Sequence, residues 1–382
     1  MKTKNLQEYL FSFCILLSIL HSPYIATFTN FFPNYNSTSI AFNVKIVIIS
    51  IALIMIVLSK KIRLPKIYKL IFLIFLTTLI LSYFALVLNN EYKLNHSLTY
   101  YYGHASVIVA VLTLIFCKYE NITNFEKPFL FFLFIFIFLV LLNDPSSIYG
   151  QGRLRYASFN PISMGHVGCM LALISLWNLL ALRRKFISLI GICLGLWLVL
   201  ESDSRGPLVS FLVSSLFLLY FKNYKVIFFS AVIIILYFFI DILISDESNF
   251  KGRLLDKNNI TILIRLELYS MYLDEIKKNI ILPDINPIYS LKYAHNILLS
   301  VYSGASIFGL MIFLYIIICS INCSIQLIKY HNQYGWISLI FIQMLTGSMF
   351  SGGLLNLNFW VFTSLVNACY YKINDEKNFK NK

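Results

Sequence analysis

Residues 296–328 read NILLSVYSGASIFGLMIFLYIIICSINCSIQLI and contain no charged side chain. A helix of about 20 apolar residues is long enough to cross the ~30 Å hydrocarbon core of a bilayer. This stretch is too long for one upright helix. It therefore predicts a membrane span that tilts, breaks near Gly304 or Gly309, or begins above the membrane.

Apolar runs of the same kind recur along the rest of the 382 residues, of which 59% are hydrophobic and only 13% are charged. Only helices and closed barrels satisfy their backbone hydrogen bonds in lipid, and these runs are too continuous for the alternating pattern of a barrel strand. We therefore predict an all-α membrane protein, with residues 1–382 forming a single polytopic domain. The predicted transmembrane helices are 9–27, 40–58, 70–88, 104–117, 129–142, 161–182, 186–200, 207–221, 226–244, 296–328, 335–350 and 357–371.

Lysine and arginine side chains predict the orientation, because cytoplasmic connections carry an excess of them. With the N-terminus inside, 19 of the 31 lie in the inner connections and four lie in the short outer connections. Both termini are then cytoplasmic, and residues 245–294 form one large extracytoplasmic loop. The net charge of +14 is interpreted as an anchor to the inner leaflet and not as a nucleic-acid-binding surface.

The large loop is expected to carry an amphipathic helix over residues 260–280 that lies on the outer leaflet. Its apolar side is assigned to Ile262, Leu263, Leu266, Tyr269, Leu273 and Ile276. Because Arg265 falls away from that side, its simplest interpretation is a solvated interfacial charge. A role in binding is the alternative.

Polar residues gather where predicted spans meet the outer face, beginning with the segment Glu201-Ser202-Asp203-Ser204-Arg205-Gly206-Pro207. The Gly206-Pro207 pair predicts a helix start, with Ser204 or Asp203 as its N-cap. An arginine beside a helix N-terminus forms an anion-binding site. The alternatives are that Arg205 snorkels or pairs with Glu201 or Asp203.

His295, in the segment Tyr293-Ala294-His295-Asn296, is the best single candidate for proton transfer. An imidazole titrates near neutral pH, and this position joins a span to the outer water. A purely structural histidine is the alternative. His166, inside a predicted span, is interpreted as a packed and hydrogen-bonded residue.

No metal or cofactor is expected. The seven cysteines lie in or beside apolar runs, and the closest pair, Cys319 and Cys323, lies one helical turn apart within a span. They are interpreted as small apolar residues and not as a disulfide framework or a metal site. The sequence also contains no P-loop, GxGxxG, HExxH or GxSxG motif.

Taken together, these segments resemble the bacterial O-antigen ligase and polymerase superfamily. The matching pieces are Ser204-Arg205-Gly206 at the start of a span, Arg265-x-x-x-Tyr269 in a large outer loop, and Ala294-His295-Asn296 followed by Gly304 and Gly309. Arg153-Leu154-Arg155, ahead of Asn160-Pro161, is similar to the family's earlier arginine-rich outer segment. The resemblance covers the order of elements from about residue 150 to 350, whereas residues 1–140 match only as generic spans.

The resemblance implies a metal-independent glycosyl transfer from an undecaprenyl-diphosphate-linked oligosaccharide at the outer face of the bacterial inner membrane. Membrane lipid and other polysaccharide assembly proteins are the further partners that it implies. Guanidinium groups bind diphosphate oxygens bidentately and stabilise the charge that grows as the sugar bond breaks. The residues carried over are Arg205 and Arg265 for the diphosphate, Arg153, Arg155, Tyr269 and Asn296 for substrate contacts, and His295 for assisting the acceptor. Because Glu201 and Asp203 beside Arg205 depart from the family's pattern, Asp203 is an alternative base.

Within the superfamily we favour the polymerase, which joins repeat units into O-antigen or capsule-type surface polysaccharide. The outer loops are rich in tyrosine and amide groups, as in Tyr100-Tyr101-Tyr102. These groups suit neutral sugars better than the phosphate-rich lipid A core that a ligase would receive. A ligase is therefore the first alternative for this chain.

A transporter or flippase for a lipid-linked sugar is the alternative from another class. Such a protein would carry polar groups near the midplane of the bilayer. Here Lys45 and Asp241 are the only charged residues within the predicted spans, and both lie near the ends. A non-catalytic assembly subunit is a third interpretation.

Overall fold

The computed structural model describes residues 2–31, 37–57, 65–89, 95–117, 125–142, 161–181, 185–202, 204–222, 260–278, 281, 295–331 and 333–380. These residues fold almost entirely into helices, and this described part of the chain contains no strand. The predicted all-α fold is confirmed to that extent.

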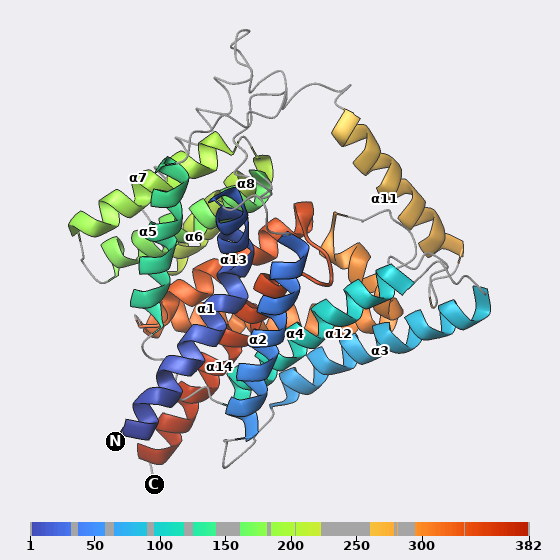
Figure 1. Ribbon diagram of the computed structural model, residues 1–382, viewed down its shortest axis with the longest axis horizontal. Coiled ribbons are helices and arrows are strands. Elements are labelled where there is room, and N and C mark those ends of the chain that lie inside the picture. The colour runs from blue at the N-terminus through green and yellow to red at the C-terminus, as the bar shows by residue number, and fades with distance from the viewer. Residues whose placement is uncertain are drawn as a thin grey trace.

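Figure 1 shows the arrangement of the helices. In chain order they are α1 (Lys2–Phe31), α2 (Ser37–Val57), α3 (Lys66–Asn89), α4 (Asn95–Cys117), α5 (Glu126–Leu142), α6 (Pro161–Leu180), α7 (Lys185–Glu201), α8 (Arg205–Phe221), α11 (Ile260–Lys278), α12 (Ile297–Tyr330), α13 (Gly335–Ser351) and α14 (Leu357–Lys380).

Each predicted span that falls on described residues coincides with one of these helices, while the predicted span 226–244 lies outside them. In the part of the chain that the structure describes, three helices contain stretches that are long and apolar enough to cross a membrane, namely Ile40–Val57 in α2, Pro161–Leu180 in α6 and Ile297–Tyr330 in α12. Several shorter apolar helices accompany them. The apolar helices indicate a membrane protein, and the total of twelve crossings stays a prediction.

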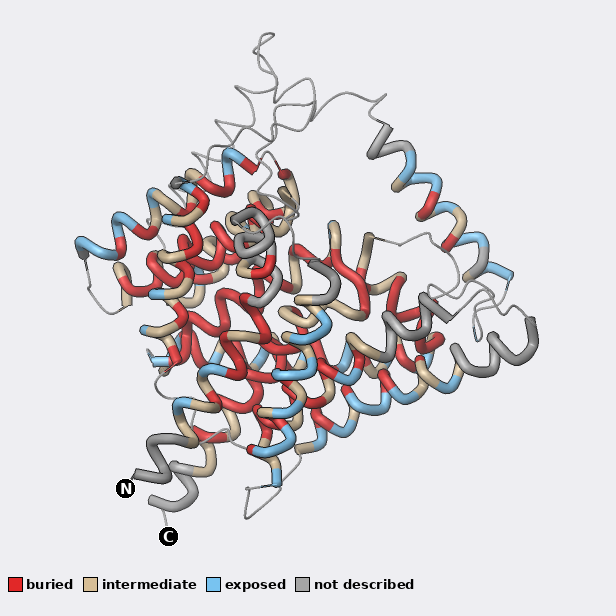
Figure 2. The backbone as a smooth tube through the Cα atoms, in the orientation of Figure 1, coloured by how far each residue is buried: buried red, intermediate tan, exposed pale blue. Residues whose placement is uncertain are grey.

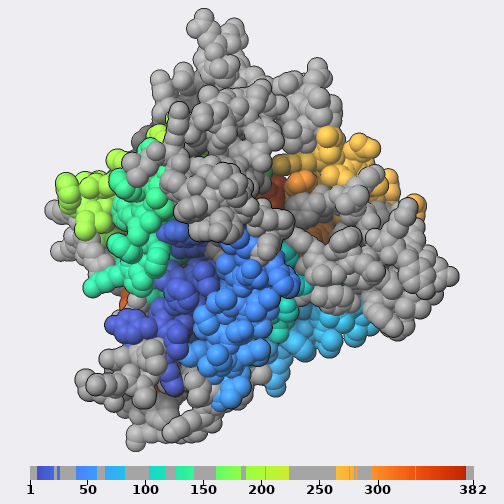
Figure 3. Space-filling model, viewed as in Figure 1, coloured from blue at the N-terminus to red at the C-terminus, as the bar shows by residue number. Residues whose placement is uncertain are grey.

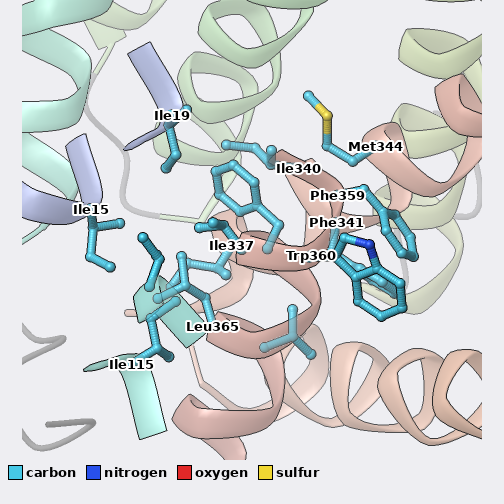
Figure 4. Packing of buried hydrophobic residues seen from close by; sticks show 14 of the residues in the cluster. Ile15, Ile19, Ile115, Ile337, Ile340, Phe341, Met344, Phe359, Trp360 and Leu365 are labelled. Atoms are coloured by element: carbon cyan, nitrogen blue, oxygen red, sulfur yellow. The ribbon is translucent and has the colours of Figure 1, made fainter. Parts of the chain in front are cut away.

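The core lies where α12, α13 and α14 pack against α1, α3 and α4 (Figure 2). Trp360 of α14 makes edge-to-face contacts with Phe75 of α3 and Phe313 of α12, at ring-centroid distances of 5.4 and 5.8 Å. Its indole N–H donates a hydrogen bond of 2.7 Å to the Leu354 carbonyl, so the polar end of this buried ring is satisfied. Figure 4 shows the surrounding layer of side chains, which includes Ile15, Ile19, Ile115, Ile337, Ile340, Phe341, Met344, Phe359 and Leu365.

The outer helices carry large apolar side chains on their exposed faces. Phe42 and Val57 of α2 are 63% and 81% exposed, and Phe186 and Ile187 of α7 are 76% and 66% exposed. Exposed apolar side chains gathered on a surface mark an interaction site, and we expect these faces to contact lipid.

Helices α6 and α7 approach each other closely because glycines line their contact. A Cβ atom built on Gly195 of α7 would lie 2.6 Å from the carbonyl oxygen of Gly168 in α6, and one on Gly191 would overlap the hydroxyl of Ser175. Gly191 and Gly195 form a G-x-x-x-G pattern, which lets two membrane helices bring their backbones together.

Helix α12 is bent at Ser306, which has a left-handed backbone with φ of 66° and ψ of −176°. Gly304 packs at the same level against α3, where an added Cβ would lie 3.0 Å from Thr78 Cγ2. The expected break near Gly304 or Gly309 is therefore confirmed. It leaves a short first segment, Ile297–Ala305, that is about 13 Å long at 1.5 Å per residue.

Candidate functional site

The start of α12 carries the predicted pair His295 and Asn296. His295 has a φ of 51°, a left-handed conformation that non-glycine residues rarely adopt and that recurs at functional sites. Asn296 is the N-cap, and its side-chain oxygen accepts hydrogen bonds from the amides of Leu298 and Leu299 at 2.9 and 3.3 Å. The cap sets the residue at which α12 begins.

The same end of α12 is tied to the connection between α13 and α14. The Asn296 amide donates to the Met349 carbonyl at 3.1 Å, and the Leu354 amide donates to the Ser300 hydroxyl at 3.0 Å. Within the connection, the Asn356 amide donates to the hydroxyl of Ser348 at 3.0 Å. These bonds attach the start of α12 to the C-terminal end of α13 and to the connection that follows it.

The start of α8 also contacts the C-terminal end of α13. Ser204, one of the two predicted N-cap residues, occupies the N-cap position with an extended backbone, but its hydroxyl donates to the Ser202 carbonyl and makes no capping hydrogen bond; Arg205 is the first helical residue. A Cβ on Gly206 would lie in ordinary contact with Phe350 Cβ, at 3.7 Å. The consecutive residues Met349 and Phe350, at the C-terminal end of α13, thus contact the starts of α12 and α8. This places Arg205 and His295 at one end of α13.

Helix α11 carries Arg265 on the same side as its buried residues. The buried side of α11 is formed by Leu268 and Tyr272, while Leu266 and Leu273 are 57% and 52% exposed. Exposed Leu266 and Leu273 agree with a predicted apolar side that faces lipid, and the contact of α11 with the outer leaflet stays a prediction. Arg265 lies on the buried side, since residues 265, 268 and 272 share one face of a helix.

Part of the Arg265 guanidinium is shielded from solvent, and the residue as a whole is partly buried. Its Nε atom is buried and has no hydrogen-bond partner among the residues that the structure describes. Buried polar groups of this kind call for a partner, which here includes an anionic ligand. Tyr269 follows one turn later on the same helix and is partly buried.

Arg265 and His295 interact electrostatically although they come from different elements. Burial, and then the positive charge of Arg265, lower the pKa of His295 from its ordinary value of 6.5. The imidazole is therefore largely neutral at pH 7, and a neutral imidazole can act as a base. Guanidinium and neutral imidazole together provide an anion-binding group beside a proton acceptor.

No family model, no curated protein and no solved structure matches this chain.

Other predicted site residues have different outcomes. Arg153, Arg155 and Asp203 lie outside the described residues. His166 is a packed, hydrogen-bonded residue as predicted, with its Nδ1 3.2 Å from the Gln343 amide nitrogen. Among the described residues, no group of three or more His, Cys, Asp or Glu side chains could hold a metal ion.

The sequence did not identify the end of α13 and the connection after it, which contact the starts of α8 and α12. These contacts come from Met349, Phe350 and the connection through Leu354 to Asn356. They are made largely by backbone groups, and no motif identifies such residues. The one available signal was Gly352-Gly353, a glycine pair between two apolar spans with Ser351 before it and Asn356 after it. Such a pair indicates a tight connection and does not show which helices that connection contacts.

Proposed function

We propose that this protein polymerises undecaprenyl-diphosphate-linked oligosaccharide repeat units into O-antigen or capsule-type polysaccharide at the outer face of the bacterial inner membrane. The observation that carries the proposal is the interaction of Arg265 with His295 at the start of α12, with the Arg265 Nε buried. Transfer of a glycan from a diphosphate donor needs a cation that binds the diphosphate and a base that accepts the proton of the acceptor hydroxyl.

In the proposed reaction a hydroxyl of the acceptor sugar attacks the anomeric carbon of the donor. The bond between that carbon and the diphosphate oxygen breaks, and undecaprenyl diphosphate leaves with the electron pair. The proton of the attacking hydroxyl passes to His295, or to Asp203 as the alternative base. Arg205 and Arg265 bind the diphosphate and stabilise the charge that develops on it.

The polymerase is preferred over the ligase on the composition of the outer loops. A deletion strain distinguishes the two. Loss of a polymerase leaves single repeat units on the acceptor, whereas loss of a ligase leaves long chains on undecaprenyl diphosphate and none on the core. The second pattern would transfer the proposal to the ligase and leave the arginine site unchanged.

The arginine site has a test with a control on the same helix. We expect Arg265→Ala and Arg205→Ala to abolish long-chain polysaccharide, and Arg205→Lys to restore little of it because an ammonium lacks the planar fork. Lys277→Ala is the matched control. Lys277 is exposed on α11 and pairs with Asp274 at 3.1 Å. Normal chain length in both arginine-to-alanine variants, at normal protein level, would refute the site.

A further inference from the structure

A buried glutamine of α13 holds the imidazole of His166 in α6. The Gln343 amide nitrogen lies 3.2 Å from His166 Nδ1 and donates to the His166 backbone carbonyl at 3.0 Å. An amide nitrogen only donates hydrogen bonds, so Nδ1 accepts, and the imidazole is neutral with its proton on Nε2. The Gln343 side chain, which is fully buried, thus fixes both the orientation and the tautomer of the ring.

Gly347 of α13 leaves room for this ring. A Cβ atom built on Gly347 would overlap Cε1 of His166 and would lie 2.9 Å from Nε2. Gly347 precedes by two residues Met349, whose carbonyl accepts the hydrogen bond from Asn296. Two residues of a helix span about 3 Å along its axis, so the imidazole lies close to the end of α13 that contacts the start of α12.

The helix that carries His166 also packs against the start of α8. A Cβ atom on Gly165 would lie 2.7 Å from Cγ of Pro207, and the Cys169 thiol donates to the Pro207 carbonyl at 3.0 Å. Pro207 is the third residue of α8, which begins at Arg205. His166 therefore lies near the helix start that carries Arg205, at the same end of α13 as the proposed site.

The donor nitrogen of His166 has no partner within the described part of the chain. Helix α2 forms a broad part of the molecular surface (Figure 3), whereas residues 167–175 of α6 are all buried. His166 is nevertheless partly exposed, and among the described residues no hydrogen bond involves its Nε2. The Gln343 Oε1 atom is also buried without a partner among these residues. A polar group inside a membrane helix is costly, so a pair that leaves such groups unused marks a functional position.

We propose that His166 is a further substrate-binding residue, whose Nε2–H donates to an oxygen of the substrate head group, either on the diphosphate or on the sugar attached to it. The inference rests on the proposed function, because the lipid-linked donor is its ligand. A neutral imidazole with a fixed proton supplies a hydrogen-bond donor without adding a third positive charge to those of Arg205 and Arg265. Gln343 is a positioning residue that acts through His166.

Nitrogen NMR of the unaltered chain tests the tautomer first. Full-length protein labelled with ¹⁵N-histidine is placed in lipid nanodiscs, and His166→Gln assigns the signals. We expect a protonated Nε2 and an unprotonated Nδ1 in His166. In Gln343→Leu, which removes the donor to Nδ1, both tautomers should appear.

Two lipid probes then test the contact in the same samples. The first is undecaprenyl diphosphate, and the second is the same lipid carrying the repeat unit isolated from the strain that encodes this chain. A shift of the His166 Nε2 signal with both probes assigns a diphosphate oxygen, and a shift with the second probe alone assigns a sugar oxygen. No shift with either probe would overturn the inference.

Activity separates this inference from the proposed function. His166→Phe retains a ring but loses the donor, so we expect kcat/KM for polymerisation to fall about tenfold, as for the loss of one hydrogen bond. His166→Gln should recover part of it, because its amide retains a donor. His331→Phe, at the C-terminal end of α12, is the matched control with unchanged kcat/KM. Unchanged kcat/KM in His166→Phe beside an inactive Arg265→Ala would refute this inference alone, whereas full activity in both would refute the proposed function.

Discussion

At the scale of single residues, the candidate site depends on what surrounds His295 more than on the histidine itself. The left-handed backbone and the cap made by Asn296 set its position, while burial first and the charge of Arg265 second lower its pKa. An unfavourable backbone conformation costs about 1–3 kcal/mol and persists only when neighbouring contacts hold it. The bonds from Asn296 to Met349 and from Leu354 to Ser300 are such contacts.

The electrostatic interaction predicts a change in the titration of His295. Its pKa in the folded chain is lowered by burial first and by Arg265 second, so Arg265→Gln should raise that pKa toward 6.5. Because the unfolded chain binds the proton more readily, this histidine's contribution to stability is intact above pH 6.5 and is lost as the pH falls below it. NMR of ¹³C-labelled histidine, with His295→Gln to assign the signal, measures the pKa of His295 in the unaltered protein and in Arg265→Gln. Identical titrations in the two proteins would show that Arg265 does not act on His295.

The N-cap predicts a graded loss of stability. Asn296→Ala removes both the cap and the bond to Met349, and should destabilise the protein by about 1–2 kcal/mol. Asn296→Asp retains the oxygen that accepts from Leu298 and Leu299 but loses the donor to Met349. Its stability should therefore lie between that of the unaltered protein and that of Asn296→Ala. Thermal unfolding in lipid nanodiscs compares the three proteins. An aspartate variant as weak as the alanine variant would assign the stability to the Met349 bond alone.

At the scale of helices, the sequence indicates where elements lie better than which way they face. Long apolar runs placed the described spans, because lipid requires every backbone group of a span to be paired within its helix. The orientation of α11 could not be derived in that way. Its apolar residues are divided between a buried side at Leu268 and Tyr272 and an exposed side at Leu266 and Leu273, so one hydrophobic periodicity cannot distinguish protein from lipid. The same periodicity could not decide between a solvated Arg265 and an Arg265 at a binding site.

The close crossing of α6 and α7 predicts intolerance of one methyl group. Gly195→Ala would press a Cβ against the Gly168 carbonyl and against Ala172 in α6, and overpacking of this kind costs about 1–3 kcal/mol. Gly103→Ala is the matched control, because a Cβ there meets open space and alanine favours a helix by about 1 kcal/mol. Thermal unfolding should separate the two variants in opposite directions, and equal melting temperatures would contradict the glycine contact.

At the scale of the whole molecule, the distribution of charge and the positions of the two termini both agree with the predicted orientation. The N- and C-terminal ends of the chain lie side by side in Figure 1, and lysines and arginines are concentrated in the connections expected inside. Composition was sufficient to predict a membrane protein and to propose its orientation. It could not predict that the starts of α8 and α12 and the buried side of α11 gather at the end of α13, since that depends on packing between segments far apart in the sequence.

The charge bias predicts the side of the membrane on which each connection lies. Fusion of a reporter that is active only outside the cytoplasm should give activity after Glu201, at the end of α7, and none after Lys222, at the end of α8. A reporter that is active only in the cytoplasm should give the complementary result at both points. The reverse pattern would invert the molecule and would remove the proposed reaction from the outer face.

The bend at Ser306 has a consequence for biosynthesis. The segment before it, Ile297–Ala305, is too short to cross a bilayer alone, and it is held by residues 53 and 54 positions later in the chain. A nascent chain leaves the ribosome from its N-terminus onward, so His295 reaches its place only after α13 and the connection to Leu354 have been synthesised. The residue proposed to accept the proton is therefore positioned near the end of translation, and a polypeptide that stops within α13 contains His295 but lacks the contacts that hold it in place.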